Sequence, residues 1–204
     1  MVMENKAVNV ANKIMYHISR ENNWNIGDVL IAGERENQFW SICKDYSPRV
    51  IVDGKEMSIF QMIDQVSNFE VTQNNITFLY QKLKDVSKEM AFYIREQIFE
   101  DVRSKHYPML PSRQKCLWVC EEDQIAYWKT MKEDCQRSLR TLELNGELFC
   151  GDDHWLTADT FSSVDYTDRA KHYWNGEMSD APRKEFLFYG KAIIKEIISI
   201  KALR

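Results

Sequence analysis

Glycine and proline are scarce in this chain, with 7 and 4 residues among 204. This scarcity argues against disorder, long linkers and a loop-rich sandwich. The sequence also has no apolar run of the about 18 residues that a membrane helix needs. Residues 1–12 lack the apolar core of a secretory signal. A net charge of −4 gives no broad attraction to nucleic acid or to an anionic membrane.

The number and spacing of the cysteines do not suggest disulfide pairs. Their number is five, and no Cys-x-x-Cys occurs, so a disulfide framework is not expected. This usage predicts a reducing, cytoplasmic compartment. We interpret Cys116 and Cys120 as buried strand residues, because no second ligand pair stands at zinc-site spacing. The alternative metal site has carboxylates and a histidine without helical i, i+4 spacing, and it comprises Asp152, Asp153, His154, Asp159 and Asp165.

What remains is an ordinary globular composition, 44% hydrophobic and 28% charged, which favours one domain spanning 1–204. The first half predicts a strand at 13–20 and a short buried strand at 29–31. Irregular chain follows at 34–55. A change to helical periodicity then predicts a helical insertion at about 56–105, with one or two helices between 73 and 104.

The second half predicts more strands than helices. Residues 116–120 favour a strand that leads into a helix opened by acidic residues. Asn145-Gly146 predicts a hairpin turn inside a strand pair at 139–150. A short helix is expected at 167–174, and 183–200 reads as strand, turn at Gly190 and strand. The fold class is therefore α+β, with helices on a mixed or antiparallel sheet.

Three segments carry residues suited to chemistry. His17 lies on the strand at 13–20, the aromatic pair Tyr127-Trp128 lies on the helix after 120, and Glu185 stands where an apolar strand begins. Each also has a common structural explanation, since half-buried histidines, packed aromatics and solvated glutamates are frequent in any domain.

Together these segments resemble the ADP-ribosyltransferase superfamily, in the branch whose three motifs carry histidine, tyrosine and glutamate. Tyr16-His17 matches the first motif, and Glu185 with the aromatic strand after it matches the last. The middle motif is matched by 116–120 followed by 125–128. The sequence Pro-Ser-Arg at 111–113, with Ala-x-x-Tyr-Trp-x-Gly at 170–176, is also similar to a bacterial domain family of unassigned function with that fold.

The resemblance implies a split sheet and NAD as substrate, without a metal. Glu185 would be catalytic, since a carboxylate can stabilise the oxocarbenium-like state formed when nicotinamide leaves ribose. His17 would line the same cleft and anchor NAD. Trp128 and Tyr173 compete with Tyr127 for the nicotinamide ring, and a structural ion pair competes with pyrophosphate for Arg113. The residues expected to contact NAD are His17, Ser19, Arg113, Tyr127 and Tyr173.

The resemblance also implies a partner beyond NAD. The acceptor would be a macromolecule, protein or nucleic acid, and members of this superfamily act as toxins, anti-phage effectors or regulators. A neighbouring antitoxin or regulator is a corresponding expectation. Two alternatives stay open: an NAD glycohydrolase on the same fold, and a non-catalytic interaction module that uses the helical insertion.

Overall fold

The computed structural model describes residues 7–20, 24–45, 49–52, 54–65, 72–130 and 137–199. Its main sheet has the strand order β1-β6-β7-β2, and a short strand β5 also pairs with β7. All the pairings within it are antiparallel, which confirms the α+β prediction. The strands are β1 (Val8–Arg20), β2 (Val29–Ala32), β5 (Leu117–Val119), β6 (Arg137–Asp152) and β7 (Lys184–Ser199).

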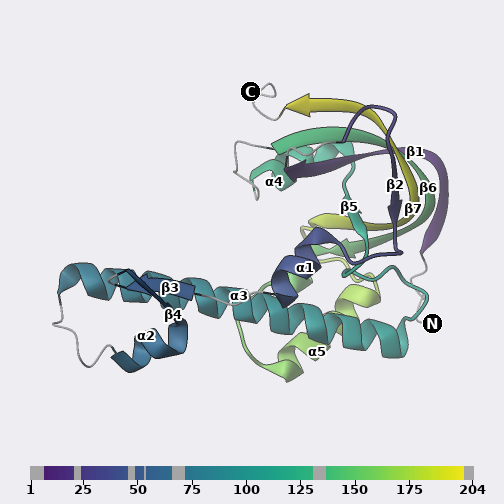
Figure 1. Cartoon of the computed structure of the whole chain (residues 1–204). Coiled ribbons are helices and arrows are strands. Elements are labelled where there is room, and N and C mark those ends of the chain that lie inside the picture. The colour runs from purple at the N-terminus through teal and green to yellow at the C-terminus, as the bar shows by residue number, and fades with distance from the viewer. Residues whose placement is uncertain are drawn as a thin grey trace.

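Two of these strands run through turns that the sequence predicts. β6 and β7 each run unbroken for 16 residues, so the hairpin turns expected at Gly146 and Gly190 are wrong. The two glycines instead face each other in the β6–β7 pairing. Because neither has a side chain, the backbones can approach closely, and the paired strands curve over the molecule without breaking (Figure 1).

The strands close on themselves. β1 pairs with β6, β6 with β7 and β7 with β5, and Cys120 directly after β5 bridges to Tyr16 of β1. The bridge consists of two backbone hydrogen bonds of 2.9 and 2.8 Å between those residues. A ring of strands results, and we call the β1–β5 contact the seam.

Strands β5, β6 and β7 contribute to two hydrophobic cores, because successive side chains point to opposite faces of the sheet. Met15, Phe186 and Phe188 belong to a cluster whose buried members all come from the strands. Leu187 belongs to the other cluster, which packs the sheet against two helices. Those helices are α3 (Gln73–His106) and α5 (Ser163–Trp174).

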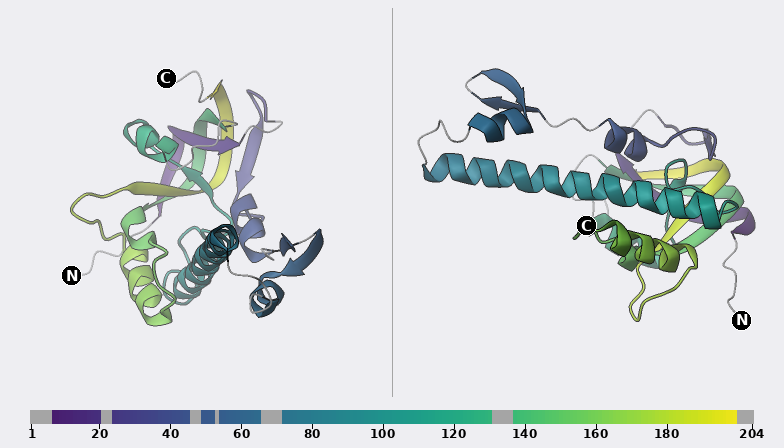
Figure 2. Two further views of the ribbon diagram at one scale, coloured as in Figure 1. Left: turned by 90° about the vertical axis from the view of Figure 1, so that its left-hand side faces the viewer. Right: turned by 90° about the horizontal axis from the view of Figure 1, so that it is seen from below.

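α3 is one 34-residue helix, which begins at the predicted residue 73 and ends two residues beyond the predicted 104. Its second half packs beside α5 and the sheet, where Ala91, Phe99 and Val102 are buried. Its first half extends away from the sheet together with α2 (Ile59–Gln65) and the hairpin of β3 (Arg49–Val52) and β4 (Lys55–Ser58) (Figures 1 and 2). We call this projection the arm. The helical block is therefore an arm in its first half and part of the core in its second.

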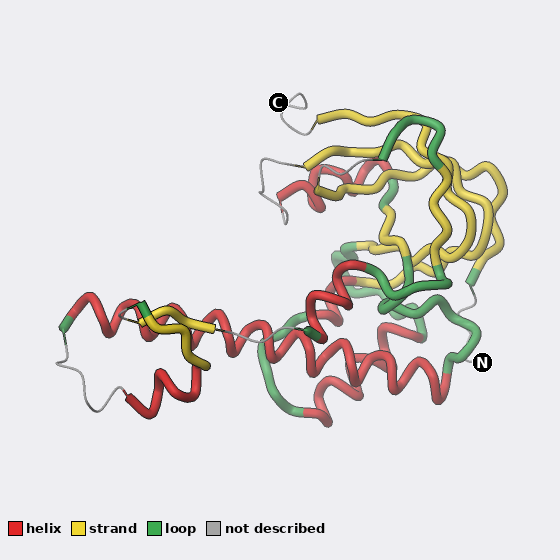
Figure 3. Tube along the Cα trace, viewed as in Figure 1, coloured by secondary structure: helices red, strands yellow, loops and turns green. Residues whose placement is uncertain are grey.

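Three further expectations are corrected. Residues 34–55 contain helix α1 (Gln38–Lys44), β3 and the start of β4 rather than irregular chain (Figure 3). β2 is an edge strand with Val29 and Ile31 exposed, not a buried one. α5 begins at Ser163, four residues earlier than predicted, and the Ser162 side chain caps it. Among the described helices, none is long and apolar enough to cross a membrane.

Candidate functional site

Glu185 lies near the start of β7, on the face that meets the helices. Its neighbour Leu187 belongs to the core between sheet and helices, and alternation places Glu185 on that same face. The residue opposite in β6 is Gly151. A Cβ there would lie 2.4 Å from the ring of Tyr173, so the glycine makes room for that phenol. Tyr173 comes from α5 and donates its hydroxyl hydrogen bond to Glu185.

A buried network of charges surrounds this carboxylate. Arg113 donates to Glu185 through Nη1, and to Glu96 through Nε at 3.0 Å and Nη2 at 3.2 Å. Glu96 also accepts from Arg95, whose Nη2 lies 2.6 Å away. All four side chains are at most 7% exposed. Two guanidinium groups thus balance two carboxylates, and removing one member would leave an uncompensated buried charge.

The two carboxylates hold their protons differently. Burial raises the pKa of Glu185, and the guanidinium of Arg113 only partly opposes this effect. Glu96 is buried as deeply, yet Arg113 and Arg95 together lower its pKa from 4.5 to about 2. Glu96 therefore has the larger share of the positive charge, and Glu185 is the carboxylate of the two that takes up a proton more readily.

The depressed pKa of Glu96 predicts acid-sensitive stability. Its contribution is complete above pH 4.5, its ordinary value, and is lost as pH falls toward 2. For a shift of this size the loss is about 3 kcal/mol. Urea unfolding between pH 7 and 3 should show wild type losing more free energy than Glu96→Gln. Both proteins should carry Glu185→Gln in this comparison, because Glu96 helps to raise the pKa of Glu185 and its removal would change that contribution as well. An equal loss of unfolding free energy in the two proteins would contradict this assignment.

Glu185 opens onto a cavity of about 240 Å³ between the seam and the helices. Aromatic side chains form much of its wall, and Arg95, Arg113 and Asp153 add charged groups. Trp118 stands in β5, and Phe39 from α1 packs edge-on against it at 5.4 Å. The other lining residues are Tyr16, Ile18, Val119, Cys120, Trp128 and Leu156. Cys116 and Cys120 are buried at β5, as predicted.

His17 and Ser19 lie elsewhere, and the prediction that His17 and Glu185 line one cleft is wrong. Alternation along β1 presents Tyr16 and Ile18 to the cavity and turns His17 and Ser19 to the opposite face. His17 Nδ1 lies 2.7 Å from the Trp118 carbonyl oxygen, which makes it the donor there. That bond supports the seam. Ser19 Oγ instead accepts a hydrogen bond from Arg140.

Of the other residues predicted to contact NAD, Arg113 lines the cavity, Tyr173 contacts Glu185, and Tyr127 lies outside the lining. Tyr173 bonds Glu185 directly. Tyr127 is outside the lining, and its hydroxyl donates to Asp153 at 2.8 Å, whereas its neighbour Trp128 forms part of the wall. Arg113 forms the structural ion pair that the sequence left open as one alternative.

Sequence reasoning missed Arg95, Glu96 and Gly151. The two charged residues carry a signal in retrospect, because Ala91, Arg95 and Phe99 follow one another at i+4 on a buried helix face. A charge inside such a stripe is paired or functional. Gly151 offers no comparable signal, since its partner Tyr173 is distant in sequence.

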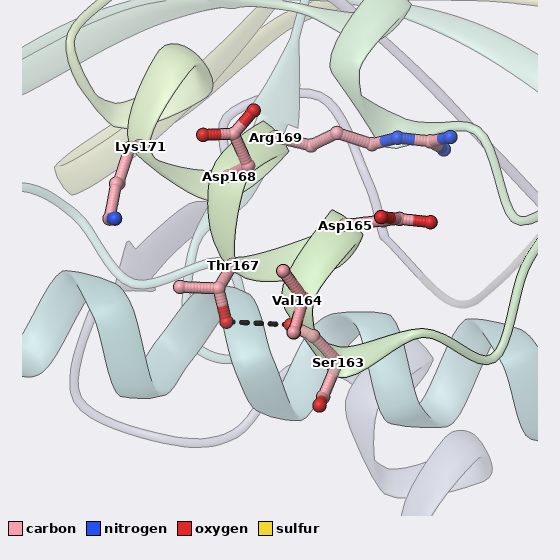
Figure 4. Close-up of a pocket in the computed structure, with 7 residues that line it drawn as sticks. All are labelled: Ser163, Val164, Asp165, Thr167, Asp168, Arg169 and Lys171. Carbon is pink, nitrogen blue, oxygen red and sulfur yellow. Dashed lines mark hydrogen bonds between the residues drawn. The ribbon is translucent and has the colours of Figure 1, made fainter.

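Neither remaining candidate site brings ligands together. The hollow along α5 is lined by side chains from residues 163–171 of that one helix (Figure 4). In the alternative metal site, the Asp152 carboxylate accepts hydrogen bonds from His154, Ser179 and Arg183, and Asp159 pairs with Arg169. Within the described part of the chain, no three histidine, cysteine or acidic side chains group as metal ligands.

Comparison with known proteins gives a family without an activity. A family model described as protein of unknown function (DUF2441) matches residues 15–200. No curated protein matches the sequence. The match spans both the seam and the cavity residues.

Proposed function

This chain belongs to the DUF2441 family, and from the chemistry of its cavity we propose that it is an NAD-dependent ADP-ribosyltransferase. The observation that carries the proposal is the buried carboxylate of Glu185, which opens onto an aromatic-walled cavity and is held by Arg113 and Tyr173. The resemblance of the glutamate segment to that superfamily supports the same reaction. The histidine part of the resemblance does not, because His17 faces away.

The arrangement suits departure of nicotinamide from ribose. Positive charge develops at the anomeric carbon in that step, and a carboxylate fixed beside it stabilises the charge. Arg113 and Tyr173 fix the position of Glu185, so little reorganisation is needed when the charge forms. The Trp118 and Trp128 rings offer flat apolar surfaces for the departing base.

The size of the cavity limits which part of NAD enters. Its 240 Å³ is below the roughly 300–1,000 Å³ usual for a whole ligand. We therefore place the nicotinamide and its ribose inside, with the rest of NAD outside. The acceptor, protein or nucleic acid, then approaches from the same mouth.

Incubation with labelled NAD, with and without cell extract, tests the proposal. Wild type should release nicotinamide and transfer label, and Glu185→Gln should reduce both at least about 100-fold, because one electrostatic contact at the reacting centre has that effect. Ser163→Ala, outside the cavity on α5, is the matched control. Nicotinamide release without transfer would favour the glycohydrolase, and no release with any extract would refute NAD chemistry.

The arm favours a second candidate function, a binding module. It exposes large apolar side chains, with Ile51 at 72%, Phe60 at 75% and Tyr80 at 62% exposure, and such clusters mark interaction surfaces. Under this candidate the charge network has a structural role only, and NAD is neither bound nor cleaved.

A further inference from the structure

The cavity is lined by a second carboxylate, Asp153, which could accept a proton from an attacking nucleophile. Asp153 begins the 3-10 turn Asp153–Leu156 that follows β6, and it lines the cavity together with Glu185. Glu185 is engaged by Arg113 and Tyr173. Transfer also requires a group that accepts a proton from the attacking nucleophile, and Asp153 is placed for this step.

We propose that Asp153 is a further catalytic residue, the general base that deprotonates the acceptor as it attacks. The proposal rests on the proposed function. The bond from C1′ to the nicotinamide nitrogen breaks, and its electron pair goes to that ring nitrogen. The acceptor oxygen or nitrogen forms the new bond to C1′, and its proton passes to the Asp153 carboxylate.

The hydrogen bonds of Asp153 are asymmetric in the way a base requires. Oδ2 accepts from the Tyr127 hydroxyl at 2.8 Å and lies 3.5 Å from Nε of Arg183. Oδ1 has no partner among the described residues. One oxygen thus holds the side chain in place, and the other oxygen remains for the acceptor.

The backbone around Asp153 is fixed from two sides. Its N–H donates to the Arg183 carbonyl at 2.9 Å. The neighbouring Asp152 is fully buried, and it accepts from the backbone N–H groups of His154, Ser179 and Arg183 at 2.8–3.0 Å. These bonds join the turn to the segment that leads into Glu185, so the two carboxylates share one rigid frame.

Azide tests the proposal, because this anionic nucleophile carries no proton to remove. Nicotinamide release from NAD with cell extract is measured for wild type, Asp153→Asn and the control Asp159→Asn, an exposed carboxylate outside the cavity. Asp153→Asn should slow release about 100-fold, and sodium azide should restore it at least about tenfold with ADP-ribosyl azide as product. Asp159→Asn should match wild type, and thermal unfolding verifies that each variant is folded.

The outcomes separate this inference from the function it rests on. If wild type leaves NAD intact, the proposed function fails and the role of Asp153 with it. If wild type cleaves NAD and Asp153→Asn does so within about threefold, the base is not Asp153, and the transferase stands. A folded Asp153→Asn protein that is slow and gains nothing from azide also overturns the role, since a lost base is the defect that azide repairs.

Discussion

Replacing Arg113 with alanine is expected to lower the free energy of unfolding by about 3–5 kcal/mol, the usual cost of breaking a buried ion pair. The guanidinium is 5% exposed and contacts both Glu96 and Glu185. Glu96 would keep Arg95 as a partner, but Glu185 would keep only the hydroxyl of Tyr173. A buried carboxylate with so little compensation must take up a proton or unfold its surroundings. Urea denaturation at pH 7 measures the loss.

An exposed ion pair and a double variant serve as controls for this result. Lys13→Ala removes a pair with Glu121 in which both side chains are more than one-third exposed, and it should cost less than about 1 kcal/mol. Adding Glu185→Gln to Arg113→Ala should recover part of the loss, because the orphaned charge is gone. A cost for Arg113→Ala as small as that for Lys13→Ala would contradict the network.

The parts of the fold that the sequence predicts are those set by local pattern. Alternation predicts the core of β1, and helical periodicity predicts α3, because both depend on neighbours within a few residues. Asn145-Gly146 and Gly190 misled for the same reason. A single glycine locally predicts a turn. Here its structural role depends on the glycine opposite it in the neighbouring strand, 44 residues away in the sequence.

The candidate site shows the same division. Glu185 is recognisable because it stands where an aromatic, apolar strand begins, and its burial in the structure requires a reason. The sequence predicts NAD contacts for its partners Arg113 and Tyr173 rather than contacts with Glu185, because no local pattern links residues from a loop, a helix and a strand. The strand that carries His17 is predicted correctly, but its orientation is not. Tyr16 and Ile18 line the cavity, and His17 between them points to the opposite face of the sheet.

Replacing Gly146 with alanine should destabilise the protein by about 2–6 kcal/mol. Its backbone has φ +155°, and an added Cβ would lie 2.1 Å from the Tyr189 carbonyl oxygen and 2.9 Å from Cα of Gly190. The strained conformation costs about 1–3 kcal/mol, and forcing the paired strands apart adds a comparable amount. Because both obstacles are backbone atoms, no side-chain rotation can relieve the collision. Urea unfolding measures the change.

Gly27→Ala is the matched control, since it imposes the strain without the collision. Gly27 has φ +92°, and a Cβ there would meet nothing within 4 Å. Gly27→Ala should therefore destabilise the protein only by the cost of backbone strain, about 1–3 kcal/mol. Gly146→Ala proving no worse than Gly27→Ala would mean that the strands do not approach at this point. Gly190→Ala provides a second check, because its Cβ would meet Asn145 O at 2.5 Å. Both methyl groups enter the same gap, so the double variant should cost less than the sum.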